Sequence, residues 1–248
     1  MPRTARTVFP DTAHHVVARG VNRQRLFRTG YDKRKYLQRF ARLAIELNIQ
    51  VHAFCLMDNH MHWILTPPSK QALGKFFQRL HTAWAMYYNS RYGRTGHLFQ
   101  NRYFSSPLDW KHFWTAIRYV EANPMRAGFQ GRPEEWDFSS ARARLTGKRD
   151  EDIVLSLLDW ERLYGPNRWR EFLGPTWQEQ CTLIEQQLRR TIRSSRPCGS
   201  DEWLREQELR HGPFRRWRPP GRPLRQLEVL AKVDAPHIGI AAQFGRTS

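Results

Sequence analysis

The sequence predicts an α+β fold in which an antiparallel sheet carries helices on one face. Short runs rich in β-branched and aromatic residues alternate with longer stretches whose apolar residues recur every three or four positions. Two of the short runs are joined by a two-residue turn, a connection that only antiparallel neighbours can use. The predicted order is strand, helix, strand, strand, helix, strand, helix, and a split βαβ arrangement accommodates it.

The first expected strand covers residues 14–20 and leads into a basic loop. Arg19, Asn22 and Arg23 at this point are candidates to hold a phosphate backbone, although a solvated loop explains single residues equally well. Residues 32–48 then show the apolar spacing of an amphipathic helix, with Asp32 placed to cap it.

The stretch 49–67 predicts two strands, 49–57 and 60–67, joined by a turn at Asp58 and Asn59. Side chains alternate faces along a strand, so His60 and His62 project to the same side. Two neutral imidazoles held at a fixed separation suit a divalent metal ion. The alternative is a histidine pair on the wetter face of a half-buried sheet.

A second helix is predicted over residues 71–91, and a short strand over residues 100–107. Asp109 then caps a third helix, which is expected to stop near Pro124 because proline disfavours helical geometry in the residue before it. The domain is expected to close near Gly147.

Composition points to a polyanionic partner. The 248 residues include 41 Lys+Arg against 23 Asp+Glu, a formal net charge of +18. Nucleic acid is the expected partner, because arginine pairs well with phosphate oxygens and no membrane-type amphipathic stretch is present; the alternative is a merely basic protein. The absence of a signal peptide and of a long apolar run, together with three scattered cysteines (Cys55, Cys181 and Cys198), predicts a soluble cytoplasmic protein.

The third helix carries a second group of candidate catalytic residues. Tyr119 and Asn123 are four positions apart and share one helical face. A tyrosine phenol can attack a phosphodiester, and a metal held by the histidine pair could polarise the phosphate, with the Asn123 amide oxygen as a further ligand. Taken singly, Tyr119 could be a packing residue and Asn123 a helix-end residue. Spacing leaves other tyrosines open as the nucleophile: Tyr87, Tyr88, Tyr92 and Tyr103.

Three ordered motifs resemble a known family. NHMHWILTP at 59–67, HLFQNRYFSSPLD at 97–109 and YVEANPMRAGF at 119–129 look like the HUH single-tyrosine transposases, and more closely like the REP-associated tyrosine transposases. The opening HHVVARGVNRQRLF and the later RPCGSDEWL also resemble that branch. The likeness is close over residues 14–147 and loose beyond them.

The resemblance implies roles for the residues already singled out. His60 and His62 would be the histidine pair of the HUH motif, Asn123 the third metal ligand and Tyr119 the nucleophile. The family uses Mg²⁺ or Mn²⁺ to cut single-stranded DNA that carries imperfect hairpins, leaving a 5′-phosphotyrosine and a free 3′-hydroxyl. The protein is therefore expected to be nucleoid-associated, and it could act as a monomer or as a homodimer.

The sequence predicts three segments: the catalytic domain at 1–147, a helical extension at 148–195 and an arginine- and proline-rich arm at 196–248, partly disordered. The arm contains the stretch FRRWRPPGRPLR, which either reads a minor groove or attracts DNA without specificity. Besides the loop residues named above, the expected DNA contacts are Arg102, Arg118, Arg126, Arg215, Arg216, Arg218 and Arg222.

The sequence favours a strand-transfer enzyme, because it combines a tyrosine, two histidines and an asparagine. A DNA-binding protein that retains the fold but no longer cuts is the alternative, since a basic surface alone would satisfy it. A metal-dependent hydrolase that uses water in place of tyrosine is a weaker third possibility.

Overall fold

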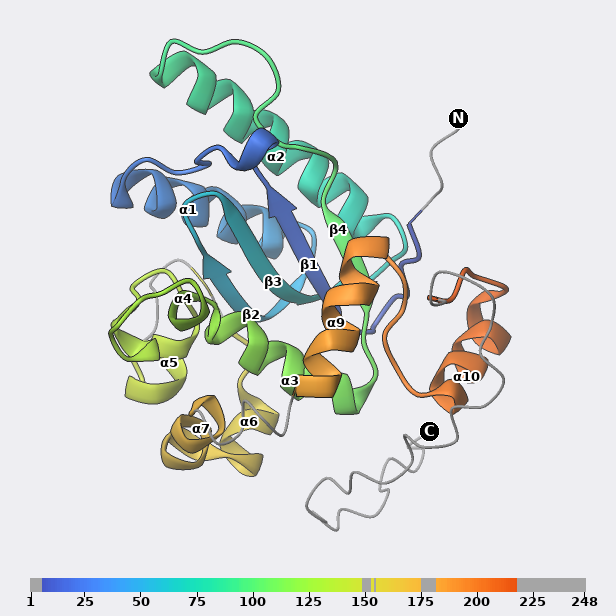
Figure 1. Ribbon diagram of the computed structural model, residues 1–248. Helices are drawn as coiled ribbons and strands as arrows, with labels where there is room; N and C mark the ends of the chain where they lie inside the picture. The colour runs from blue at the N-terminus through green and yellow to red at the C-terminus, as the bar shows by residue number, and fades with distance from the viewer. Residues whose placement is uncertain (1–5, 149–152, 154, 175–181, 218–248) are drawn as a thin grey trace. The chain divides into compact units, whose positions relative to one another are not determined.

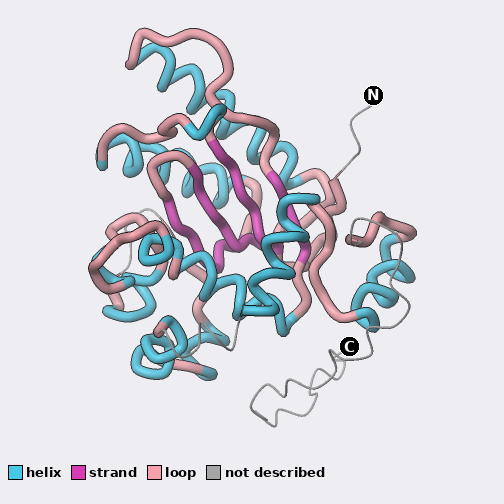
Figure 2. Tube along the Cα trace, in the orientation of Figure 1, coloured by secondary structure: helices cyan, strands magenta, loops and turns pink. Residues whose placement is uncertain are grey.

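A computed structural model describes residues 6–148, 153, 155–174 and 182–217. It shows a mixed α+β fold built on one four-stranded antiparallel sheet (Figures 1 and 2). The strands are β1 (His14–Arg19), β2 (Gln50–Leu56), β3 (His60–Thr66) and β4 (Phe104–Pro107). The predicted α+β class with an antiparallel sheet is therefore confirmed.

The strand order is β2-β3-β1-β4, so β3 lies between β2 and β1. Helix α1 (Gly30–Glu46) connects β1 to β2, and helix α2 (Ala72–Arg91) connects β3 to β4. Each helix thus links two parallel strands that have a third strand between them, which is the predicted split βαβ arrangement.

The first face of the sheet packs against α1 and α2. Met61, Trp63 and Leu65 of β3 are fully buried in this core, together with the apolar stripes of both helices. Phe40 of α1 stacks on Trp63 with ring centroids 3.5 Å apart. The alternation of side chains along a strand predicts that these three residues face away from His60 and His62, as the structure shows.

The second face is also covered, which corrects the prediction of helices on one face only. Ala53, Cys55 and Ile64 point to this side and are fully buried, so it needs an apolar cover of its own. Helix α3 (Trp110–Glu121) lies over β2 and β3, and helix α9 (Thr182–Ser194) lies over β1 and β4. Figure 1 shows both helices on the near side of the sheet, opposite α1 and α2.

Two local predictions need correction. Helix α1 is capped by Thr29, whose side chain accepts from the Asp32 backbone, while the Asp32 carboxylate accepts from the Thr29 backbone. Asp32 is therefore the third residue of a capping box and not the cap itself. Strand β4 begins only at Phe104, because residues 100–103 form bends and a loop.

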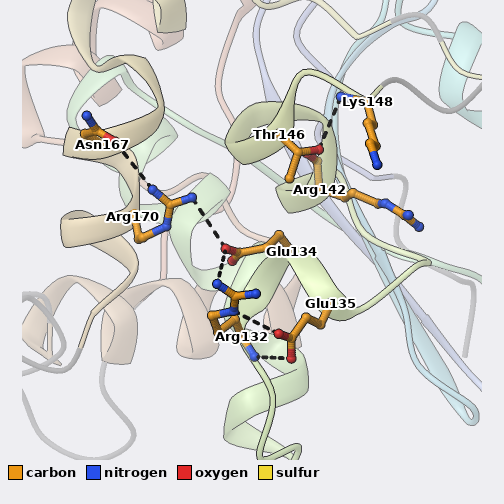
Figure 3. Close-up of polar contacts among 8 residues, drawn as sticks. All are labelled: Arg132, Glu134, Glu135, Arg142, Thr146, Lys148, Asn167 and Arg170. Atoms are coloured by element: carbon orange, nitrogen blue, oxygen red, sulfur yellow. Dashed lines mark hydrogen bonds and ion pairs between the residues drawn. The ribbon is translucent and has the colours of Figure 1, made fainter.

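Short helices follow α3. They are α4 (Asn123–Arg126), the 3₁₀ turn η2 (Pro133–Glu135), α5 (Ala141–Thr146), α6 (Leu158–Leu163) and α7 (Gly165–Leu173). Gly147 ends α5 with φ 70°, a left-handed conformation that glycine adopts at little cost. Figure 3 shows how Glu134 of η2 accepts from Arg170 of α7 and pairs with Arg132, which ties the extension to the domain.

The first part of the predicted arm, residues 196–217, is folded. Residues Asp201–His211 form helix α10, and the Ser200 side chain caps it. The Cys198 backbone accepts a hydrogen bond from Asp109 N and donates one to Pro107 O. Residues up to Trp217 accordingly form one compact unit. The predicted helix at 177–193 is seen from Thr182 onward, and its earlier part, like residues 218–248 of the arm, lies outside the described residues.

Within the described chain, no helix is both long and apolar enough to cross a membrane.

Candidate active site

Strand β3 positions the two histidines. His60 and His62 lie on the same side of the strand, and their ring centroids are 5.2 Å apart. His62 is buried, whereas His60 near the end of the strand is half-buried. In the neighbouring strand β1, Arg19 pairs with His60 and Val17 pairs with His62. The predicted projection of both imidazoles to one side is thus present in the structure.

Helix α3 brings Tyr119 onto the same side of the sheet. Asp109 caps the helix by accepting from the His112 backbone at 2.8 Å, as predicted. Near its other end, the Tyr119 ring lies 5.7 Å from the His62 ring, centroid to centroid, in an edge-on arrangement. Tyr119 is half-buried, so part of its side chain remains accessible from outside.

Asn123 is the first residue of α4 and follows Ala122, the C-cap of α3. Its amide nitrogen donates to Tyr119 O at 2.9 Å, which fixes the orientation of the side chain. The Asn123 side chain also acts on the nearby His60 ring, whose pKa it raises. The structure therefore brings together Tyr119, Asn123 and both histidines.

His15 is a neighbour that sequence reasoning missed. It is completely buried on β1, and its Nε2 lies 3.0 Å from His62 Nδ1. Its ring also meets the Tyr119 ring edge-on at 5.8 Å. The adjacent histidines at positions 14 and 15 are the sequence feature that could have indicated this role. The contact between His15 and His62 depends on the pairing of β1 with β3, which the sequence pattern does not predict.

Burial keeps these imidazoles neutral. It lowers the pKa of His15 to about 3. Burial, followed by the charge of Arg19, lowers the pKa of His60 to about 4, against the opposing effect of the nearby Asn123 amide. Burial and then the neighbouring His60 and His15 rings place the pKa of His62 well below its ordinary value. Neutral rings retain a nitrogen lone pair, as metal coordination requires.

The contact between His15 and His62 bears on which nitrogen of His62 is available. If His62 carries its proton on Nδ1 and donates to His15, its Nε2 keeps a lone pair. His15 Nε2 then accepts, and its Nδ1 is a buried atom without a hydrogen-bond partner among the described residues. A polar atom left unsatisfied in this way costs stability, which is typical of functional sites.

Cations surround the Tyr119 phenol. The Arg126 guanidinium carbon lies 4.5 Å from the ring centroid, and that of Arg189 lies 5.7 Å away. Burial raises the pKa of Tyr119, and the charge of Arg126 opposes this increase. Arg126 is itself held by Glu185 at 2.5 Å. Positive charge is therefore held close to the Tyr119 ring, where it favours the phenolate form.

The other candidate tyrosines lie elsewhere. Tyr87, Tyr88 and Tyr92 are on or just after α2, on the opposite face of the sheet, and Tyr103 packs with the same core. The Tyr92 hydroxyl donates to Asp32 at 2.7 Å. Among these tyrosines, only Tyr119 shares a face with the histidine pair.

Five of the predicted DNA contacts are accessible to a ligand. Arg19, Asn22, Arg23, Arg102 and Arg215 are exposed. Asn22 and Arg23 have φ of 49° and 60°, an unusual conformation for residues other than glycine, in the loop that follows β1.

Arg118 requires correction as a DNA contact. Its side chain is 2% exposed, and its guanidinium donates to Glu185 Oε1 at 2.6 Å and to Phe172 O at 2.5 Å. It therefore joins α3 to the later helices and is not accessible to a phosphate. Arg216 is engaged with Glu208 at 2.5 Å. Arg218 and Arg222 lie outside the described residues.

The donor chemistry of the site fits a divalent metal ion. Across the residues that the structure describes, no group of three or more histidine, cysteine, aspartate or glutamate side chains is arranged to hold a metal. His60 and His62 would thus need the Asn123 amide and oxygens of water or substrate as further ligands. Two neutral nitrogens and one amide oxygen form such an incomplete, uncharged set, and it leaves coordination positions open.

Comparison with known proteins agrees with this class of site. Residues 9–123, slightly less than half of the chain, match the family model described as "Transposase IS200 like". The matched residues extend from the segment before β1 to Asn123, so they include the histidine pair and Tyr119. Over these residues the chain is thus similar to the IS200-like transposases, which confirms the resemblance to a transposase family.

A solved structure described as "Structure of the REP associates tyrosine transposase bound to a REP hairpin" is similar to this chain with a TM-score of 0.49 and 16% identity. The match covers 63% of this chain and 93% of that one. No curated protein matches the sequence.

Proposed function

We propose that this protein is a metal-dependent single-stranded DNA endonuclease and strand transferase, with Tyr119 as the nucleophile. One observation carries the proposal: Tyr119 packs edge-on against His62, and Asn123, one helical turn later, donates its amide to Tyr119 O on the same side of the sheet. The similarity to IS200-like transposases over residues 9–123 supports DNA as the substrate. The resemblance of the motifs to the REP-associated branch favours DNA that carries hairpins.

The proposed step exchanges one phosphodiester for another. The Tyr119 phenol oxygen attacks the scissile phosphorus and loses its proton. The bond from phosphorus to the 3′-oxygen breaks, and that oxygen leaves as a hydroxyl after taking up a proton. The products are a 5′-phosphotyrosine and a free 3′-hydroxyl, and attack by a 3′-hydroxyl reverses the step without ATP.

His60, His62 and Asn123 would hold the metal, which when bound polarises the scissile phosphate. His15 would accept from His62 Nδ1 and so keep the opposite ring nitrogen available. Arg126 stabilises negative charge on the phenol oxygen as it forms, offsetting the raised pKa of Tyr119. Arg19, which pairs with His60, and Arg23, whose carbonyl accepts from Asn59, are exposed and would bind flanking phosphates.

A non-cleaving DNA-binding protein is the second candidate. It is favoured by the lack, in the described part of the chain, of a metal site built from three or more histidine or acidic side chains. The basic surface would then suffice for its function.

The test uses a labelled DNA pool in which an imperfect hairpin has randomised single-stranded flanks, because neither the hairpin nor the cleavage site is known. The protein is incubated with the pool and Mn²⁺, and the products are separated under denaturing conditions. A protein-linked DNA band supports the proposal. Shortened DNA without that band would indicate a hydrolase, and binding without either product would indicate the DNA-binding protein.

A further inference from the structure

A cavity of about 630 Å³ opens beside β4, away from the residues assigned above. Its wall comes from the segment before β1, the loop before β4, the end of α9 and the segment after α10. No aspartate or glutamate is present among its described lining residues. Five basic side chains line it: Arg6, Lys70, Arg102, Arg196 and Arg215.

Three of the five cations in this cavity have no acidic partner among the described residues. Lys70, Arg102 and Arg215 form no ion pair with any described carboxylate. This contrasts with Arg132 and Arg170 in Figure 3, which are paired with glutamates. Burial and the nearby charge of Arg215 both lower the pKa of Arg196, as expected where cations crowd together. An anion in the cavity would relieve this repulsion.

Aromatic rings lie among the cations. Phe9 stacks on His211 with centroids 4.8 Å apart and 12° between the ring planes, and Phe214 meets Phe9 edge-on at 5.2 Å. Phe104 and Phe214 are half-buried, so each keeps exposed surface. Phosphate-binding cations beside accessible rings are the combination that binds single-stranded nucleic acid.

Strand register connects the cavity to the active site. Phe104, in the cavity wall, pairs with Val17, and Val17 pairs with His62. Two strand spacings separate Phe104 from His62, roughly 10 Å. A DNA strand that enters the active site can therefore continue to the cavity within a few nucleotides.

We infer that this cavity binds a single-stranded segment of the DNA substrate, holding its phosphates with the cations and at least one base against the aromatic rings. This inference rests on the proposed function, since it assigns a second contact region to the same substrate.

The test compares DNA affinity by fluorescence anisotropy for three probes: a blunt hairpin, the same hairpin with an oligo-dT tail, and one with an abasic tail of equal length. The variant Arg102→Gln/Arg215→Gln removes two exposed cations of the cavity. The control Arg34→Gln/Arg42→Gln removes two exposed cations from α1, on the other face of the sheet.

For the cavity variant we expect a loss of about tenfold or more in affinity for the dT-tailed hairpin and no change for the blunt hairpin. The slope of log affinity against log salt should become shallower by about 1.4, since each single-strand phosphate contact contributes about 0.7. The control should change both affinities equally. The wild-type protein should bind the abasic tail more weakly than the dT tail.

Equal losses on blunt and tailed DNA, or no loss, would overturn the inference, and equal binding of abasic and dT tails would remove the base contact it requires. Failure of the proposed function is a separate result: the wild-type protein then forms no protein-linked DNA, whatever the tail affinities are.

Discussion

Replacement of Tyr119 by phenylalanine tests the centre of the mechanism. The Tyr119 hydroxyl forms no hydrogen bond with any described residue, and the phenylalanine ring can keep the contacts with His15 and His62. The free energy of unfolding should change by about 0.5 kcal/mol or less. The protein-linked product should decrease by at least about 10³-fold, which corresponds to about 4 kcal/mol of lost transition-state stabilisation.

The assay measures protein-linked DNA on denaturing gels, with thermal unfolding measured in parallel. Tyr87→Phe is the matched control, because the Tyr87 hydroxyl is also without a described partner but lies on the opposite face of the sheet. A normal yield of linked DNA from Tyr119→Phe, or a large loss from Tyr87→Phe, would refute the assignment of the nucleophile.

Three further predictions follow from the same structure. His60→Ala and His62→Ala should each abolish cleavage, and EDTA should do so reversibly; an unchanged rate in EDTA would make both histidines structural. His15→Leu should weaken Mn²⁺ binding about 10- to 100-fold, measured by calorimetry, while unchanged affinity would exclude a positioning role. Burial disfavours the charged His112 ring, but the hydrogen bond to Asp109 and the neighbouring Cys198 outweigh it and raise the pKa of His112 to about 10. This contribution to stability is complete below pH 6.5 and is lost as pH rises toward 10, so denaturant titrations should show that the stability advantage over His112→Gln shrinks across that range.

The β2–β3 hairpin could be predicted because it is determined by residues that are close together in the sequence. Alternation places His60 and His62 on one side of the strand and Trp63 on the other, and this result does not depend on what either side packs against. The cap at Asp109 is local in the same way, since its partner is only three residues away.

Contacts between distant segments could not be predicted from the pattern. His15 meets His62 only because β1 pairs with β3 in one particular register. The sequence pattern predicts Arg118 as a DNA contact, because its true partner, Glu185, is 67 positions away in the sequence. The second covered face depends likewise on α9, which follows the predicted catalytic domain.

The distribution of charge links the fold to its proposed substrate. Three buried carboxylates pair with arginines in contacts that stabilise the fold: Glu121, Glu134 and Glu185. These acidic side chains are therefore engaged in structural contacts inside the protein. Exposed cations without a described carboxylate partner include Arg19 and Arg23 beside the histidines and Arg102 and Arg215 at the cavity. The location of the carboxylates, more than the total of +18, therefore determines where a polyanion would bind.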